Sequence, residues 1–172
     1  MNFTEFFSDK TTKPKQKTEA LSDWLLKNTN KLPVLLEFAS SSKDSVRATC
    51  IEAVEFSSKQ KPTIVNEKAF VFMIKALGHK APRIKWESAK VIGNSAHLFP
   101  DKLNEAIKHL LVNTDHEGTV VRWSAAFALG EILKLKTKHN LKLIPDIQKV
   151  IEKEEKNSIK KIYLAALKKI EK

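Results

Sequence analysis

The sequence predicts an all-α fold in which pairs of helices stack along one axis. Three observations lead to this prediction. The 172 residues include only 4 Gly and 6 Pro, the charged residues are mostly Lys and Glu, and one pattern recurs four times at nearly constant spacing. A sheet protein of this size needs more turn residues, Lys and Glu are good helix formers, and a fixed period of this length is typical of repeat proteins.

The recurring pattern is a β-branched residue followed by a basic residue. The four pairs lie about 38 residues apart and are Val46-Arg47, Ile84-Lys85, Val121-Arg122 and Ile159-Lys160. Each pair opens a segment whose apolar residues recur at helical spacing. We therefore expect the second helix of each repeat at 44–54, 82–92, 119–129 and 157–167.

Each of these segments follows another amphipathic segment, which we expect to be the first helix of the pair. Leu103, Ile107 and Leu110, for example, share one helical face. The links between the two helices contain residues that begin helices, such as Asp44 and Pro82. The first helices are expected at 32–41, 66–78, 101–113 and 143–155.

An additional helix is expected at about 17–27, before the first pair. Leu21, Trp24 and Leu25 give it one apolar side, which suits a cap over the first repeat. Residues 1–16 are expected to be a flexible polar N-terminus. The prediction is thus a single repeat domain at 17–172, with repeats at about 31–60, 66–98, 100–136 and 140–172.

The repeat pattern resembles the HEAT repeat of the armadillo-type α-solenoid proteins. The third repeat is similar to a second HEAT helix through Val121, Arg122, Ala125, Ala126, Leu129 and Gly130. The second repeat matches through Ile84, Lys85, Ala89, Ile92 and Gly93, whereas the first and fourth have Glu55 and Lys168 in place of the glycine. The resemblance covers about residues 31–172. It implies a right-handed α-α superhelix whose second helices line a concave surface that binds partners.

Two positions of each second helix are expected to point into this concave surface, two and six residues after the β-branched residue. In the second and third repeats these positions contain Trp86 and Lys90, and Trp123 and Phe127. Two interpretations stay open, namely a binding surface around two neighbouring tryptophans and simple packing of these side chains. The full set of candidate binding residues is Trp86, Lys90, Asn94, His97, Trp123, Phe127, Glu131 and Lys134.

The basic residues of the four pairs form a second candidate set: Arg47, Lys85, Arg122 and Lys160. In HEAT repeats a base at this position commonly bonds carbonyls and acids between repeats. The resemblance therefore implies a structural ladder, with phosphate contact as the alternative.

The net charge of +11 is concentrated near the C-terminus. Residues 134–172 contain 12 Lys and 5 acidic residues, so this end attracts polyanions. The chain has only three arginines, fewer than most proteins that recognise phosphates through bidentate contacts. A protein or peptide segment is therefore the expected partner, and nucleic acid, bound through the basic C-terminal repeat, is the alternative.

The sequence contains no catalytic signature such as a phosphate loop or a zinc-binding His-Glu-x-x-His motif. Cys50 is expected to be a buried apolar residue rather than a nucleophile. A weaker resemblance links Trp86 and Trp123 to the aromatic side chains of HEAT-like bacterial DNA-alkylation-repair glycosylases, but no aspartate lies between them on the predicted surface. The hypothesis is accordingly a non-enzymatic scaffold without cofactor or metal ion.

Three further expectations concern the environment of the protein. No apolar run is long enough to span a membrane, and the polar N-terminus is unlike a signal peptide. The single cysteine excludes an internal disulfide. We therefore expect a cytoplasmic protein that is a monomer or a weak homodimer.

Overall fold

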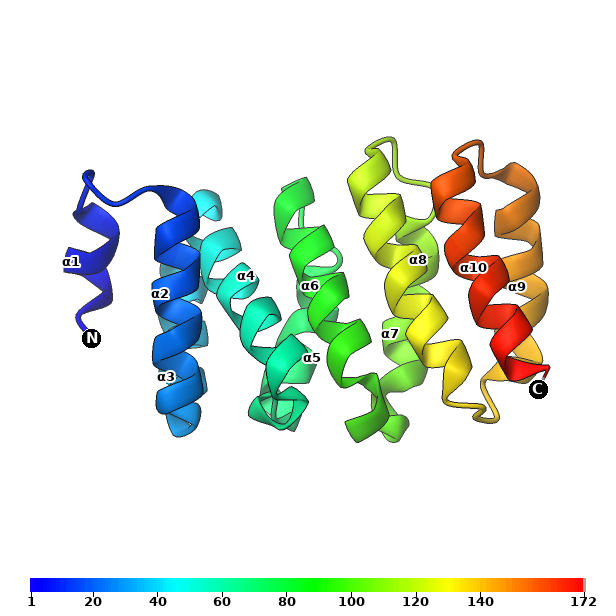
Figure 1. The fold of residues 1–172 in the computed structure, drawn as a ribbon, viewed down its shortest axis with the longest axis horizontal. Coiled ribbons are helices and arrows are strands. Elements are labelled where there is room, and N and C mark those ends of the chain that lie inside the picture. Colours follow the sequence, from blue (N-terminus) through cyan, green and yellow to red (C-terminus); the bar gives the residue numbers. More distant parts are fainter. Residues whose placement is uncertain (172) are drawn as a thin grey trace.

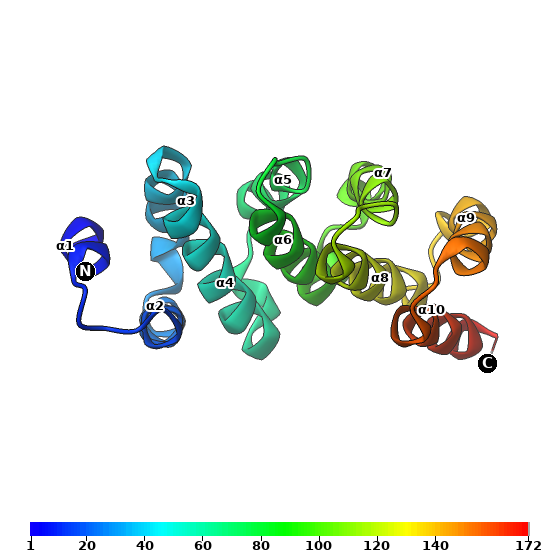
Figure 2. The same ribbon diagram turned by 90° about the horizontal axis from the view of Figure 1, so that it is seen from above.

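The computed structural model describes residues 1–171, and its helices form two layers (Figures 1 and 2). The inner layer lies at the front of Figure 1 and consists, in order, of α2 (Pro14–Lys27), α4 (Asp44–Gln60), α6 (Pro82–Ser95), α8 (Thr119–Lys134) and α10 (Asn157–Ile170). The outer layer consists of α3 (Leu32–Ser41), α5 (Glu67–Ala76), α7 (Leu103–Asn113) and α9 (Asn140–Lys153), and α1 (Phe3–Ser8) lies at the N-terminal end of the stack. The short 3-10 turns are η1 (Thr29–Lys31), η2 (Pro62–Ile64), η3 (Ala96–Leu98) and η4 (Pro100–Lys102).

Successive inner helices pack side by side, and each outer helix from α3 on packs on the inner helix that follows it. This arrangement confirms the all-α stack of helix pairs predicted from the repeat. Small residues allow the inner helices to approach closely, since Gly93 of α6 faces Ala128 of α8 and Gly130 of α8 faces Ala166 of α10. A single pair could not bury its apolar face alone, so each repeat depends on its neighbours.

The observed boundaries agree with the repeat pattern but extend the second helices. α4, α6, α8 and α10 begin at the expected residues and run three to six residues farther, whereas α9 begins at Asn140, three residues before the expected start. α8 ends where Lys136 adopts a left-handed conformation with φ 53°. That conformation interrupts the helix and allows the chain to turn into α9.

The N-terminal segment 1–16, expected to be polar and flexible, includes helical residues. It contains α1, and α2 already begins at Pro14. Phe3 is buried and packs edge-on against Trp24, with 5.3 Å between the ring centroids, and against Phe38 at 5.2 Å. Lys17 Nζ donates a hydrogen bond to the Phe7 carbonyl oxygen at 3.2 Å. A helix of 6 residues is too short to show a periodic pattern, so only its tertiary contacts identify it.

Within residues 1–171, no helix combines the length and hydropathy that crossing a lipid bilayer requires.

Candidate functional site: the inner surface

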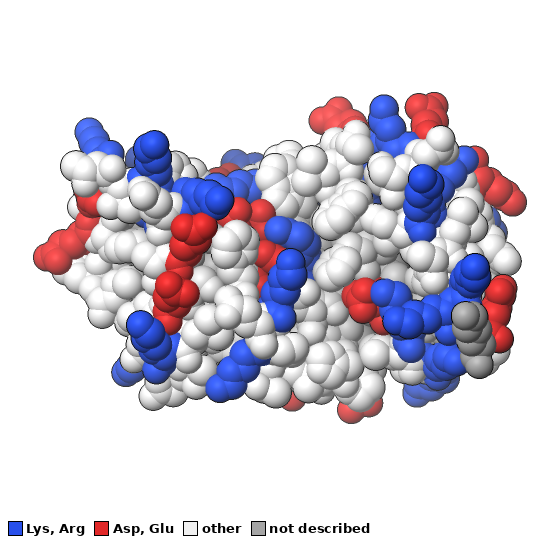
Figure 3. All heavy atoms as spheres, viewed as in Figure 1, with Lys and Arg blue, Asp and Glu red and all other residues white. Residues whose placement is uncertain are grey.

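The exposed surface of the inner layer is the candidate site, and we call it the inner surface. Seen from above, α6 and α8 are set back relative to α2 and α10, so the layer is shallowly concave (Figure 2). Charged side chains of both signs lie over the N-terminal helices, an uncharged strip lies between α6 and α8, and Lys and Arg side chains gather near the α10 end (Figure 3). The sequence-predicted residues of α6 and α8 lie in the middle part of this surface.

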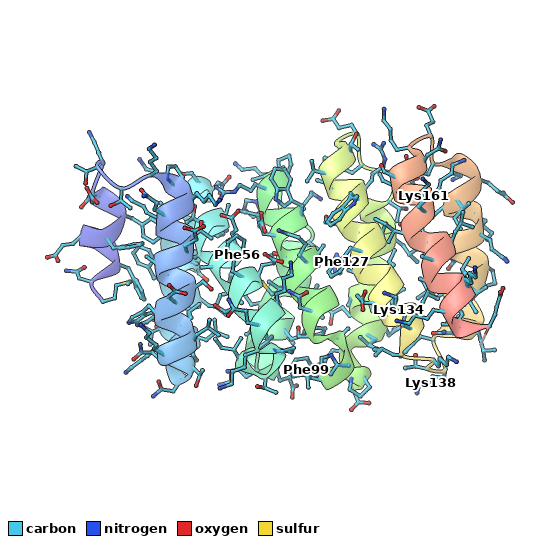
Figure 4. All side chains as sticks on the ribbon, viewed as in Figure 1. Phe56, Phe99, Phe127, Lys134, Lys138 and Lys161 are labelled. Carbon is cyan, nitrogen blue, oxygen red and sulfur yellow. The ribbon has the colours of Figure 1, made fainter. Side chains whose placement is uncertain are left out.

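Trp123 and Phe127 form an aromatic cluster on α8. Their rings are parallel within 5°, with 6.1 Å between centroids, and the Trp123 residue is 41% exposed. Phe127 lies over Gly93 of α6, because a Cβ atom at Gly93 would come within 2.6 Å of the Phe127 ring (Figure 4). The missing side chain at Gly93 therefore provides the space that positions Phe127, and Phe127 in turn supports Trp123.

Trp86 occupies the same repeat position as Trp123 but has different surroundings. It is half-buried, and its indole N–H donates a 2.6 Å hydrogen bond to Glu87 Oε1. The two tryptophans lie on adjacent helices, as expected. Within residues 1–171, however, the ring that stacks on Trp123 is Phe127 and not Trp86.

Lys90 belongs to a buried charge network rather than to open solvent. Its Nζ lies 2.8 Å from Glu87 Oε2 and 3.5 Å from Glu55 Oε2. Burial raises the pKa of Glu87, although Lys90 and the Trp86 N–H oppose this effect. Burial also acts to lower the pKa of Lys90, but Glu87 and Glu55 outweigh it, so the pKa of Lys90 is raised.

The remaining predicted residues divide between structural contacts and exposed positions. Asn94 donates to the Glu55 carbonyl oxygen at 3.3 Å and to Ser58 Oγ at 3.1 Å, which links α6 to α4. His97 is exposed in the turn η3 after α6. Glu131 and Lys134 form an ion pair of 2.5 Å along α8, and both remain partly exposed. Trp123, Phe127, Glu131 and Lys134 thus form one continuous strip on α8.

Three members of the basic set connect consecutive repeats. Arg47 Nε donates to the Ala39 carbonyl oxygen at 2.9 Å and lies 3.3 Å from His79 of the next repeat. Lys85 reaches the Leu77 carbonyl oxygen at 3.2 Å and Asn113 Oδ1 at 3.1 Å.

In the third repeat the basic residue binds a carboxylate of the next repeat, which Arg47 and Lys85 do not do in the described part of the chain. Arg122 donates to the carbonyl oxygens of His116 and Glu117 and pairs with the buried Glu154 at 2.9 Å. Burial acts to raise the pKa of Glu154, but Arg122 and the Lys156 N–H outweigh it and lower that pKa. Lys160 forms no comparable bond among the residues described, 1–171. The three bonded bases have the geometry of structural links, and their donors are already used.

Sequence reasoning missed two features of the inner surface. Phe56 of α4 is half-buried and occupies the repeat position of Asn94 and Glu131 (Figure 4). Counting from Val46, as from Ile84 and Val121 in the later repeats, would have identified it. Glu87 is buried and holds Trp86. Its carboxylate stands at a position where the neighbouring repeats have Thr49 and Ser124, and nothing in the pattern marks it.

The single cysteine of the chain does not reach this surface. Cys50 is fully buried, and burial raises the pKa of its thiol to about 12. Residues 1–171 contain no group of three or more His, Cys, Asp or Glu side chains placed to hold a metal ion. A pocket of about 440 Å³ lies between α7 and α9 of the outer layer, away from the two tryptophans. The accessible chemistry of the inner surface is therefore aromatic contact flanked by charge.

Neither a protein-family model nor a curated protein sequence matches the chain. Solved structures of helical repeat proteins share its fold. A designed armadillo repeat protein in complex with the peptide (KR)4 has a TM-score of 0.72 and 18% identity, over 91% of this chain and 74% of the designed one. The CpcE–CpcF complex of phycocyanin lyase from Nostoc has a TM-score of 0.68 and 18% identity, over 88% of this chain and 86% of that one. The chain therefore has the α-solenoid fold of armadillo and HEAT repeat proteins, as its repeat pattern indicated.

Proposed function

We propose that the protein is a non-enzymatic binding module that holds an extended segment of a partner protein on its inner surface. The observation that carries this proposal is the aromatic cluster, in which a Trp123 residue 41% exposed stands on a Phe127 ring fixed over Gly93. An exposed tryptophan on a rigid support is the kind of anchor that dominates binding energy at protein interfaces.

The shape and chemistry of the surface favour a peptide segment over a small molecule. The inner surface is long, shallow and built from five parallel helices, and the predicted residues do not line an enclosed cavity among the residues described. A designed armadillo repeat protein with a similar fold is solved in complex with a peptide, which supports a peptide as the partner. The buried thiol of Cys50 and the scattered histidines offer no alternative based on catalysis.

The test selects peptides that bind the protein from a random display library and measures their affinity for two variants. Trp123→Ala removes the proposed anchor and should weaken binding by about tenfold or more. Leu141→Ala removes a side chain of the outer layer that belongs to an 84% exposed residue, and it should leave affinity unchanged. Equal binding to both variants would show that the anchor lies elsewhere.

The stability of Trp123→Ala separates binding from packing. Because the Trp123 residue is 41% exposed and its ring packs on Phe127, removal of the indole should lower the free energy of unfolding by about 1–2 kcal/mol. A loss of about 3 kcal/mol in urea unfolding, typical of a buried aromatic side chain, would instead identify Trp123 as part of the core.

A further inference from the structure

Three carboxylates of α4 and α6 are paired with basic side chains of the protein itself. Glu52 accepts hydrogen bonds of 2.7 Å from Arg83 and from Thr18. Glu55 and Glu87 share Lys90. These groups are bonded across α2, α4 and α6, so they stabilise the layer and offer a partner little free charge.

The C-terminal half of the inner surface has the opposite character. Lys134 of α8 and Lys161 and Lys169 of α10 occupy inner-surface positions, and we call these three residues the lysine patch (Figure 4 labels the first two). Lys161 and Lys169 are exposed, and within residues 1–171 no carboxylate oxygen lies within 4.0 Å of either ammonium group. Lys134 pairs only with Glu131, through a partly exposed contact along one helix that a stronger partner can replace at small cost.

The lysine patch adjoins the aromatic cluster. Lys134 and Trp123 lie on α8, and Lys161 of α10 occupies the repeat position that Trp123 occupies on α8. Toward α10 the uncharged strip therefore gives way to a surface rich in lysine, with an acidic side chain at the border (Figure 3). A ligand that covers both needs an apolar group followed by negative charge.

We propose that the segment bound on the inner surface is an acidic peptide, with an apolar side chain on Trp123 and carboxylates over Lys134, Lys161 and Lys169. This inference rests on the function proposed above and specifies the partner for the same surface. Carboxylates of the peptide supply the counter-charges that the lysine patch lacks, and the resulting complementarity raises both specificity and the rate of association.

Two observations favour an acidic peptide over nucleic acid. Two of the three arginines, Arg47 and Arg122, make contacts between repeats, and Arg83 is paired with Glu52 at 2.7 Å. One face of Trp123 is turned to the parallel Phe127 ring, so the cluster offers one stacking place rather than the series of platforms along which single strands bind.

The experiment compares three fluorescent peptides of equal length that differ only in charge. Each has the same leucine anchor, followed by a run of Glu, of Gln or of Lys. At about 50 mM salt, where screening is weak, the Glu peptide should bind the protein about tenfold or more tightly than the Gln peptide, and the Lys peptide should bind most weakly.

Two triple variants with equal net charge locate the effect. Lys134→Gln, Lys161→Gln and Lys169→Gln together should remove the preference for the Glu peptide and weaken binding of the Glu peptide far more than binding of the Gln peptide. Lys142→Gln, Lys149→Gln and Lys153→Gln together change α9 of the outer layer and should preserve the preference. Equal losses in both variants would overturn the inference, because they would show that total charge, not the patch, attracts the peptide.

The remaining outcomes separate the two proposals. If the Glu and Gln peptides bind equally and both lose affinity in Trp123→Ala, the acidic specificity is wrong and the binding function stands. If none of the peptides binds, both proposals are wrong. If a single-stranded oligonucleotide displaces the Glu peptide and binds more tightly, the partner is a nucleic acid and the inference is overturned.

Discussion

Trp86 and Trp123 occupy equivalent positions in successive repeats, yet only one of them is open to a partner. Glu87 accepts a hydrogen bond from the Trp86 indole and helps to hold that ring half-buried, whereas Ser124 follows Trp123 and its hydroxyl donates to the Val121 carbonyl oxygen. The residue that follows each tryptophan thus makes a different contact, and only at Trp86 does it bond the indole. The sequence pattern places both rings on the inner layer, but it does not predict that Trp86 is half-buried and Trp123 exposed.

The Arg122–Glu154 pair permits a prediction at the same scale. Glu154→Gln removes the charge that Arg122 binds and should lower the free energy of unfolding by about 1–3 kcal/mol at neutral pH. Arg122 lowers the pKa of Glu154 below its ordinary value of 4.5. The stabilisation is therefore fully present above that value and is lost as the pH falls through the lower pKa of the folded state.

Urea unfolding at several pH values checks this prediction. The difference between the wild-type protein and Glu154→Gln should shrink below about pH 4.5, because protonation removes the same charge from the wild-type protein. Glu155→Gln is the matched control, since Glu155 is the exposed neighbour. A difference that stays constant down to low pH would contradict the role given to the ion pair.

At the scale of helices, the glycines of the second and third repeats look equivalent in sequence but not in space. A Cβ atom at Gly93 would lie 2.6 Å from the Phe127 ring and 3.2 Å from Ala128 Cα, whereas at Gly130 the nearest atoms, on Ala166 and Ile162, are 3.5 Å or more away. Gly93 therefore sets how closely α6 and α8 approach around Phe127, and Gly130 does so less strictly.

Gly93→Ala should accordingly lower the free energy of unfolding by about 1–3 kcal/mol, because the rigid ring must shift to admit the methyl group. Gly130→Ala meets only ordinary contacts, and alanine favours the helix by about 0.5–1 kcal/mol, so it should be neutral or stabilising. Urea midpoints of the two variants test the difference. Equal effects at both positions would show that Phe127 is not held over Gly93.

The helices themselves were largely predictable from the sequence, since the period and the apolar spacing identify all four pairs. α3 has the predicted bounds, and α4, α6, α8 and α10 start at the predicted residues. The missed element, α1, depends on contacts of Phe3 with Trp24 and Phe38, which lie far away in sequence. The missed charge network around Glu87 also joins different helices. Local patterns describe local structure, and both omissions are tertiary.

At the scale of the whole molecule, the stack is nearly one-dimensional, because each repeat contacts mainly its neighbours. A destabilising substitution at one end should therefore unfold only the neighbouring helices. Phe3→Ala should undock α1 and cost about 1–3 kcal/mol, and hydrogen exchange should accelerate in α2 and α3 but not in α8 or α10. Thr4→Ala, at an exposed position of the same helix, is the control. Faster exchange throughout the molecule would show that the repeats unfold as one unit.

The charge distribution also belongs to this scale. Acidic groups of α4 and α6 are paired within the layer, whereas lysines of α10 are exposed on its inner surface (Figure 3). The sequence showed the excess of lysine near the C-terminus, but it did not show which lysines share a surface with Trp123. The two-layer arrangement supplies that information.

The proposed function requires a partner to bind at Trp123. The indole N–H signals of the three tryptophans report directly where a peptide binds. Trp24, Trp86 and Trp123 each give one indole N–H signal in a nitrogen-15 NMR spectrum, and substitution of each tryptophan by phenylalanine assigns them. On titration with a selected peptide, the Trp123 signal should shift most, the Trp86 signal less, and the Trp24 signal should stay in place, because Trp24 packs against Phe3 at the far end of the stack. A shift of Trp24 with Trp123 unmoved would contradict the proposed site.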